Sequence, residues 1–233
     1  MSTSSTRSRL RPDLEYPYAT PAIGEFVEVA PQVQWLRLPL PMALDHINVW
    51  LLDDGDGWTL VDTGLDVPLV RDTWLRLVER ELVGRKIHRI IVTHHHPDHI
   101  GLADWLHRET GAPVWMSAAE LAACKRWACP PDDAERRRLT DFFESHGAED
   151  GNDMFGPDGL GGYGNVVSGV PDVARFLEHD DSLSAAGTDW RVMICGGHAP
   201  AHAVLWSEER DLLITGDQVL PRISSNVSVL GED

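Results

Sequence analysis

The segment THHHPDHIG, residues 93–101, places four histidines and one aspartate within nine positions, directly after an apolar run. His94 and His96 are two residues apart, so in an extended chain both side chains point to the same side. Two imidazole nitrogens can there reach one cation at about 2.0 to 2.1 Å. Asp98 and His99 follow where the chain turns into a helix, and the intervening proline aims this second pair at a different point. Two ligand pairs directed at neighbouring points predict a site for two metal ions.

A solvated polar turn is the alternative interpretation of this segment. A lone histidine near a strand end is more often a hydrogen-bonded structural residue than a ligand, but a crowd of buried polar groups without partners would be costly. Imidazole together with carboxylate suits zinc, and iron and manganese accept the same donors. We therefore expect one or two zinc ions as cofactors. His95 faces away from its neighbours and is expected not to bind metal.

The elements that position this segment alternate between strand and helix patterns. The predicted order is strands at 33–40, 47–54 and 57–64, a helix at 65–84, a strand at 86–94, a helix at 99–111, and strands at 113–117, 189–195, 201–207 and 211–217. The sequence DDGDG supplies the Asp-Gly signal of a tight hairpin between the second and third strands. This order predicts an α/β fold built as a layered sandwich.

Residues 117–180 interrupt this alternation. SAAELAACKRWA and DDAERRRLTDFFESH have helical patterns, and the glycine-rich stretch after them lacks periodic apolar positions. We expect a helical cap followed by a loop, a common location for substrate recognition. The alternative is a long surface segment that has no function of its own. The insert also offers Trp115, Leu121, Trp127, Phe142 and Phe143 as candidates for an apolar pocket, although large apolar side chains are more often core.

The histidine motif resembles the H-x-H-x-D-H signature of the metallo-β-lactamase superfamily, which includes hydrolases of the glyoxalase II and β-lactamase kinds. LVDTG at 60–64, GGHAPAH at 196–202 and LLITGD at 212–217 resemble the family's remaining blocks in the same order. GGHAPAH departs from the family pattern by carrying alanines where relatives more often have Thr or Ser and Gly. The resemblance spans about residues 33–220 and implies an αββα sandwich with a metal site at one edge; we expect the domain to cover residues 23–233.

The resemblance also implies a ligand set: His94, His96 and His198 for the first metal, Asp98 and His99 for the second, and Asp217 as the bridge between them. Asp98 would in addition orient the nucleophile, and therefore serves as the predicted catalytic residue. Asp62 would lie beneath the ligands, and His202 is expected to be a supporting residue rather than a ligand.

Such a site predicts a hydrolase, because a bound metal supplies hydroxide near neutral pH and polarises the oxygen under attack. Lys and Arg total 20 against 37 Asp and Glu, and the formal charge of -17 opposes nucleic acid and anionic membranes. A small ester or thioester is therefore the predicted substrate. The alternatives are a phosphodiesterase or endoribonuclease of the same fold, with CKRWA and ERRRL as its basic strip, and a binding protein with an incomplete site.

Three cysteines without regular spacing argue against a disulfide framework and favour the cytoplasm. No apolar run approaches the roughly 20 residues needed to span a bilayer. A homo-oligomer is compatible with the sequence. Residues 1–22 are expected to form a flexible tail, with a short transit-like segment as the alternative, because their start is rich in Arg and Ser.

The end of the chain differs from the family pattern. Relatives usually supply one more histidine beyond the bridging aspartate, whereas no histidine follows His202 here. The final PRISSNVSVLGED has neither a strand nor a helix pattern. We therefore expect that the C-terminal part of the fold is missing and that the second metal, one ligand short, binds weakly.

Overall fold

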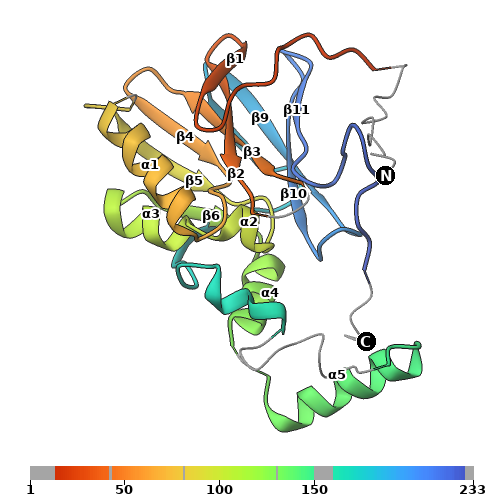
Figure 1. Ribbon diagram of the computed structural model, residues 1–233. Coiled ribbons are helices and arrows are strands. Elements are labelled where there is room, and N and C mark those ends of the chain that lie inside the picture. The colour runs from red at the N-terminus through yellow and green to blue at the C-terminus, as the bar shows by residue number, and fades with distance from the viewer. Residues whose placement is uncertain (1–13, 42–43, 81, 130, 150–159, 229–233) are drawn as a thin grey trace, which may run out of the picture.

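The computed structural model describes residues 14–41, 44–80, 82–129, 131–149 and 160–228 (Figure 1). Parts of the expected tail, of the glycine-rich loop and of the C-terminal stretch lie outside these ranges. None of the helices in the described ranges is long and apolar enough to cross a membrane.

A larger sheet forms the centre of the fold. Among the described residues it has seven strands in sequential order: β1 (Phe26–Ala30), β2 (Val33–Pro39), β3 (His46–Asp53), β4 (Gly57–Val61), β5 (Lys86–Ile91), β6 (Val114–Met116) and β7 (Val173–Phe176). The first four pair antiparallel, and β4 to β7 pair in parallel. Because β4 and β5 run in parallel, the residues that follow each of them emerge at the same end of the sheet.

A second sheet packs against the first. In the described part of the chain it is antiparallel with the order β11-β10-β9-β8, formed by β8 (Ser182–Ala185), β9 (Thr188–Cys195), β10 (His202–Ser207) and β11 (Leu212–Ile214). Buried and exposed residues alternate along β8, as expected for a strand with one face on the core. The core between the sheets includes Leu52, Ile91, Trp190 and Leu205, and it fixes the two sheets face to face.

The outer face of the larger sheet is covered by α1 (Pro68–Arg80) and α3 (Ala103–Thr110) (Figure 1). Val70, Trp74 and Leu77 form the buried stripe of α1, at the spacing of an amphipathic helix. The Trp74 indole donates a hydrogen bond to the carbonyl of Thr63 at 2.7 Å, which fastens α1 to the chain that follows β4. Among the described residues, no helix covers the outer face of the smaller sheet in Figure 1.

Three more α-helices lie beyond the sandwich faces in the described ranges: α2 (Pro97–Ile100), α4 (Ala118–Ala128) and α5 (Asp133–Ser145), followed by the short 3-10 helix η2 (Leu160–Asn165). Ser117 caps α4 by accepting a hydrogen bond from the amide of Glu120, and Asp132 caps α5 in the same way. Leu121 and Trp127 bury one side of α4 against the core.

The α/β sandwich expected from the strand and helix patterns is confirmed, and every strand and helix of that order is present in the structure. The insert expected at 117–180 is too long, because β7 within it is a strand of the larger sheet. β1, β7 and β8 did not appear among the expected strands. β7 and β8 have four residues each, too few for a distinctive alternation of polar and apolar residues.

Candidate metal centre

The histidine segment lies where the two sheets end together. β5 ends at Ile91, and the chain passes through His94 to the start of α2, which Figure 1 shows at the end of the sandwich near α4. Asp62 directly follows the neighbouring parallel strand β4, and His202 is the first residue of β10. Asp217 follows β11. Segments far apart in the sequence thus bring their polar side chains to one edge of the sandwich.

His94, His96 and His198 form the first group that could hold a metal ion. The Nε2 atom of His94 lies 3.0 Å from Nδ1 of His96 and 3.2 Å from Nε2 of His198. His94 is fully buried, and the other two are partly buried. Three nitrogens that face one another at such distances match the donor set of a tetrahedral site with one open position.

Hydrogen bonds on the far side of two rings determine which nitrogen faces the centre. The amide and the hydroxyl of Thr93 both donate to Asp62, at 2.8 and 2.9 Å. Since this hydroxyl proton is used, Nδ1–H of His94 donates to the Thr93 oxygen at 3.0 Å, and its Nε2 is left with a lone pair. Likewise, Nδ1 of His198 donates to the carbonyl of Asn226 at 2.8 Å. The Nε2 lone pairs of His94 and His198 therefore face each other, and a cation bound between them would remove their mutual repulsion.

Burial, reinforced by the neighbouring imidazoles, lowers the pKa of His94 well below its usual value and that of His96 to about 3. Both rings are therefore neutral near pH 7. Neutral imidazole is the form that binds metal, so these rings need to release no proton before a metal can bind.

The second group that could hold a metal consists of His94, His99 and Asp217. His99 is buried and donates from Nδ1 to Asp62 at 2.8 Å. Its Nε2 atom has no hydrogen-bond partner, and lies 3.4 Å from a carboxylate oxygen of Asp217 and 3.7 Å from one of Asp98. A buried nitrogen without a hydrogen-bond partner, close to two carboxylates, is the arrangement expected where a cation binds between them.

The charges around His99 agree with that fit. Burial lowers the pKa of His99, but the carboxylates of Asp62, Asp98 and Asp217 outweigh it and raise the pKa well above the usual value. For Asp217, burial raises the pKa, but the nearby imidazole of His99, 3.4 Å away, outweighs it and holds the pKa at about 2. The local field therefore favours positive charge at Nε2 of His99, which either a proton or a metal ion can supply.

Asp62 and His202 lie behind the two groups. Asp62 accepts hydrogen bonds from Thr93 and His99, and so orients the chain on both sides of the site. His202 is fully buried, and its Nε2 accepts from the amide of Asp217 at 3.2 Å. A Cβ on Gly216 would lie 2.6 Å from that nitrogen, which explains the glycine before Asp217. Burial lowers the pKa of His202 to about 4, so the ring is neutral and can accept this bond.

His95 points away from both groups. Its Nδ1 bonds to the carboxylate of Glu120 at 2.6 Å. Glu120 is a residue of the site that the motifs in the sequence did not predict. The spacing of Ser117 and Glu120 in the sequence is typical of a capping box, in which the glutamate side chain accepts from the backbone amide of the N-cap residue, here Ser117. Instead, the carboxylate of Glu120 accepts from His95 and from the amide of Ala201. Burial raises the pKa of Glu120, but the hydrogen bond from His95 and the other donors outweigh this effect. The net pKa is lowered, so Glu120 is ionised.

The expected apolar pocket is not built as the sequence suggested. Leu121 and Trp127 are buried in the core, and Trp115 lies between the guanidinium groups of Arg89 and Arg175. Leu121 and Trp127 stabilise the packing, as large apolar side chains at helical spacing normally do, whereas Trp115 also lines an open pocket toward the amino ends of β4 and β5. The role expected for Phe142 and Phe143 on α5 stays a prediction.

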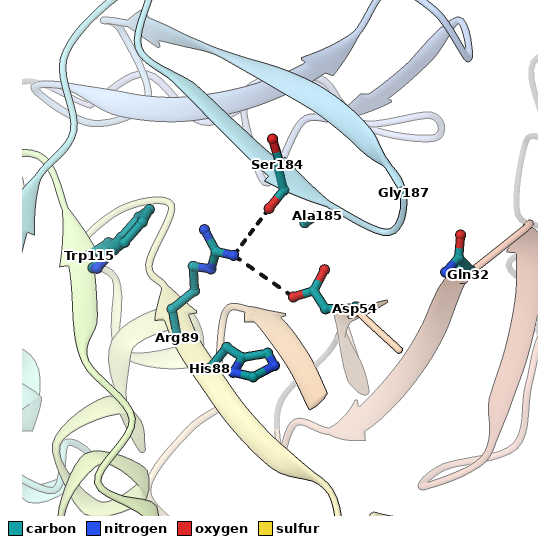
Figure 2. A pocket seen from close by; sticks show the side chains of 8 residues that line it. All are labelled: Gln32, Asp54, His88, Arg89, Trp115, Ser184, Ala185 and Gly187. Carbon is teal, nitrogen blue, oxygen red and sulfur yellow. Dashed lines mark hydrogen bonds and ion pairs between the residues drawn. The ribbon is translucent and has the colours of Figure 1, made fainter. Parts of the chain in front are cut away.

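An open pocket of about 520 Å³ lies elsewhere, toward the amino ends of β4 and β5. Figure 2 shows Arg89 in this pocket between the Ser184 carbonyl, at 3.1 Å, and the carboxylate of Asp54, at 3.9 Å. Asp54 also accepts from the amide of Ala186 at 2.9 Å. These contacts join the two sheets, so the polar groups of this pocket already have partners within the protein.

A sequence model of the metallo-beta-lactamase superfamily matches residues 42–231, and the chain belongs to this superfamily. The family expected from the sequence motifs is thereby confirmed. The solved structure of a beta-lactamase domain protein from Burkholderia ambifaria is 39% identical, with a TM-score of 0.77 over 91% of this chain and 62% of that chain.

Two curated proteins are also similar to this chain. "Probable metallo-hydrolase YqjP" of Bacillus subtilis (strain 168) is 25% identical over 203 residues, which make up 82% of this chain and 58% of that protein. A hydroxyacylglutathione hydrolase of Albidiferax ferrireducens is 35% identical over 83 residues, or 36% of this chain and 29% of that protein. The chain therefore spans less than two thirds of the length of either relative.

The geometry of the first group predicts that the protein copurifies with a transition metal. Three neutral or lone-pair-bearing imidazoles are already directed at one point, so little reorganisation opposes binding. Elemental analysis after purification without chelators should find zinc, iron or manganese in an amount comparable to the protein. Trace metal alone, in protein that still binds none when zinc is added, would contradict this assignment.

Proposed function

We propose that the protein is a metal-dependent hydrolase of small esters or thioesters. The observation that carries the proposal is the convergence of the imidazoles of His94, His96 and His198, with the carboxylates of Asp98 and Asp217 beside them. A zinc ion bound there would lower the pKa of a coordinated water toward about 7 and polarise the oxygen under attack. The names of the two curated relatives, a probable metallo-hydrolase and a hydroxyacylglutathione hydrolase, support hydrolysis as the reaction class.

The roles of the acidic residues follow from where they lie. Asp98 stands in the first turn of α2 with its side chain partly exposed, so it can reach both the centre and the solvent side. We assign to it the orientation of the nucleophile and the acceptance of its proton. Asp217, between His99 and His198, would bridge two metals. The second group, His94, His99 and Asp217, shares His94 with the first group, and one ring nitrogen of His94 cannot serve both metals, so we propose the second as the weaker site.

A thioester is favoured over a polyanion. The similarity to a hydroxyacylglutathione hydrolase, whose name denotes a thioester substrate, supports it directly. The formal charge of -17 opposes phosphodiester polymers. In the proposed basic strip, Arg126 pairs with Glu135 at 2.8 Å, and Arg138 lies 4.0 Å from the same carboxylate. This pairing reduces the positive charge that a phosphodiester would require.

A reducing compartment such as the cytoplasm is part of the proposal. Cys124, Cys129 and Cys195 form no disulfide, and Cys124 is buried. These observations agree with a protein that does not depend on oxidation for its stability.

The substrate class predicts the outcome of a side-by-side assay. Zinc-loaded protein should hydrolyse acyl thioesters and simple esters faster than bis(p-nitrophenyl) phosphate or RNA, because the site offers a polarising metal without a basic surface for the polyanion. The same panel measured on protein treated with a chelator gives the metal-independent background. Faster cleavage of the phosphodiesters would overturn the substrate class, and activity unaffected by the chelator would overturn the mechanism.

A further inference from the structure

A buried carboxylate connects the two loops that carry the first group of histidines. Glu120 on α4 is fully buried, and three hydrogen-bond donors converge on it. One oxygen accepts from the backbone amide of His95 at 2.9 Å and from its Nδ1 at 2.6 Å. The other oxygen accepts from the amide of Ala201 at 2.6 Å. Both oxygens are therefore used, each by a different loop.

The two residues held by Glu120 lie next to metal-binding positions. His95 stands between His94 and His96 in the sequence, and Ala201 belongs to the short loop between β9 and β10 that carries His198. The distance from α4 to each loop therefore fixes how far His198 lies from the other two histidines.

Two further contacts strengthen this arrangement. The hydroxyl of Ser117, at the start of α4, donates to the carbonyl of Ala201 at 2.9 Å. The hydroxyl of Tyr163 in η2 donates to the carbonyl of His95. The backbone amide and carbonyl of His95 are thus both held from the side of α4 and η2, as expected where a loop must keep one conformation.

We propose that Glu120 is a positioning residue, which, through His95 and Ala201, holds the two histidine loops at the separation that the first metal requires. The inference rests on the metal-binding part of the proposed function. Glu120 touches neither metal ligands nor substrate, so its effect is on the affinity and geometry of the site. Outer partners of this kind typically contribute about 10- to 100-fold to metal affinity.

A merely structural role would lower the stability of the fold without a specific effect on the metal. The pocket of Figure 2 supplies a matched control, because Asp54 also accepts a backbone amide across the two sheets, from Ala186 at 2.9 Å, and a hydroxyl from Thr59 at 2.8 Å. Asp54 lies at the opposite end of β4 from Asp62 and the histidines. Asp54→Asn should therefore weaken a comparable connection far from the metal.

The test compares Glu120→Gln with Asp54→Asn and wild type. Zinc affinity is measured by competition with a chromophoric chelator, the cobalt-substituted absorption spectrum reports ligand geometry, and thermal unfolding of the metal-free protein reports stability. Glu120→Gln replaces one accepting oxygen by an NH2 group, which must then face a donor of either His95 or Ala201, so we expect zinc affinity to fall by about 10- to 100-fold with an altered cobalt spectrum. Asp54→Asn should lose stability and keep both metal readouts.

A second pair of variants applies if Glu120→Gln does not fold. The side-chain amide of asparagine can replace Nδ1–H as a donor to Glu120, so His95→Asn should retain zinc affinity while His95→Ala loses it. Wild-type affinity and an unchanged cobalt spectrum in Glu120→Gln, or equal losses in both His95 variants, would overturn the proposal. Wild-type protein that binds zinc but hydrolyses nothing would contradict the proposed function and leave the affinity comparison valid. Wild-type protein that binds no zinc would overturn both.

Discussion

Replacing His96 with alanine is expected to abolish stoichiometric metal binding and to lower ester or thioester hydrolysis by about 10³-fold or more. A bound metal supplies several kcal/mol of transition-state stabilisation, and about 1.4 kcal/mol corresponds to a tenfold change in rate. The Nδ1 atom of His96 lies 3.0 Å from Nε2 of His94 and belongs to the first group. Its loss leaves that group with His94 and His198, too few ligands for a catalytic site of this type.

His88→Ala is the matched control for this replacement. His88 lies on β5, upstream of the same loop, is partly exposed, and bonds to Asp56 at 2.8 Å. The control should bind metal and turn over substrate as wild type does. Elemental analysis, zinc titration and turnover are measured on all three proteins. Retention of stoichiometric zinc in His96→Ala would exclude His96 from the ligand set.

The part of the site that could be predicted from residue spacing alone is the part that is contiguous in the chain. His94 and His96 share one side of an extended segment, and Asp98 and His99 open a helix after a proline, so local geometry determines where they point. The structure brings His94 within 3.2 Å of His198, a residue more than a hundred positions away. No local pattern predicts that contact, and only the resemblance to a family indicated it.

Glu120 shows why the supporting residues could not be predicted in the same way. Its neighbours in the sequence predict a helix start, and its side chain could have capped that helix. The choice between capping and bonding to His95 depends on how closely α4 approaches the histidine loop, which is a property of the folded sandwich. The same dependence on packing explains why Trp127, expected as a pocket candidate, is a packing residue instead.

The hydrogen bonds behind the histidines determine how the nitrogen atoms that could bind a metal face the centre. Asp62 accepts from Thr93 and His99, and Thr93 in turn accepts from His94, so one carboxylate fixes the ring orientation in both groups. Asp62 itself has a φ of 66°, in the left-handed region that is unfavourable for most residues. The three donors that Asp62 satisfies at this position offset that backbone cost, which links the local conformation at the end of β4 to the geometry of the site.

Asp98→Asn is expected to retain zinc in the first group and to lower turnover by about 10²- to 10⁴-fold, the range typical of a lost general base. Asp98 is absent from the first group, and its carboxylate lies 3.7 Å from Nε2 of His99 on the partly exposed side of the centre. Asparagine keeps the size of the side chain, but it cannot accept a proton or carry negative charge. The change should therefore appear mainly in kcat.

Asp104→Asn provides the control, because Asp104 stands in the first turn of α3 as Asp98 does in the first turn of α2, and pairs with Arg108 away from the histidines. Zinc content, kcat and KM across pH are measured for both variants. Wild-type turnover by Asp98→Asn would remove Asp98 from the mechanism. Loss of all zinc from Asp98→Asn would instead show that Asp98 acts by holding metal, since an amide oxygen is a weaker ligand than a carboxylate.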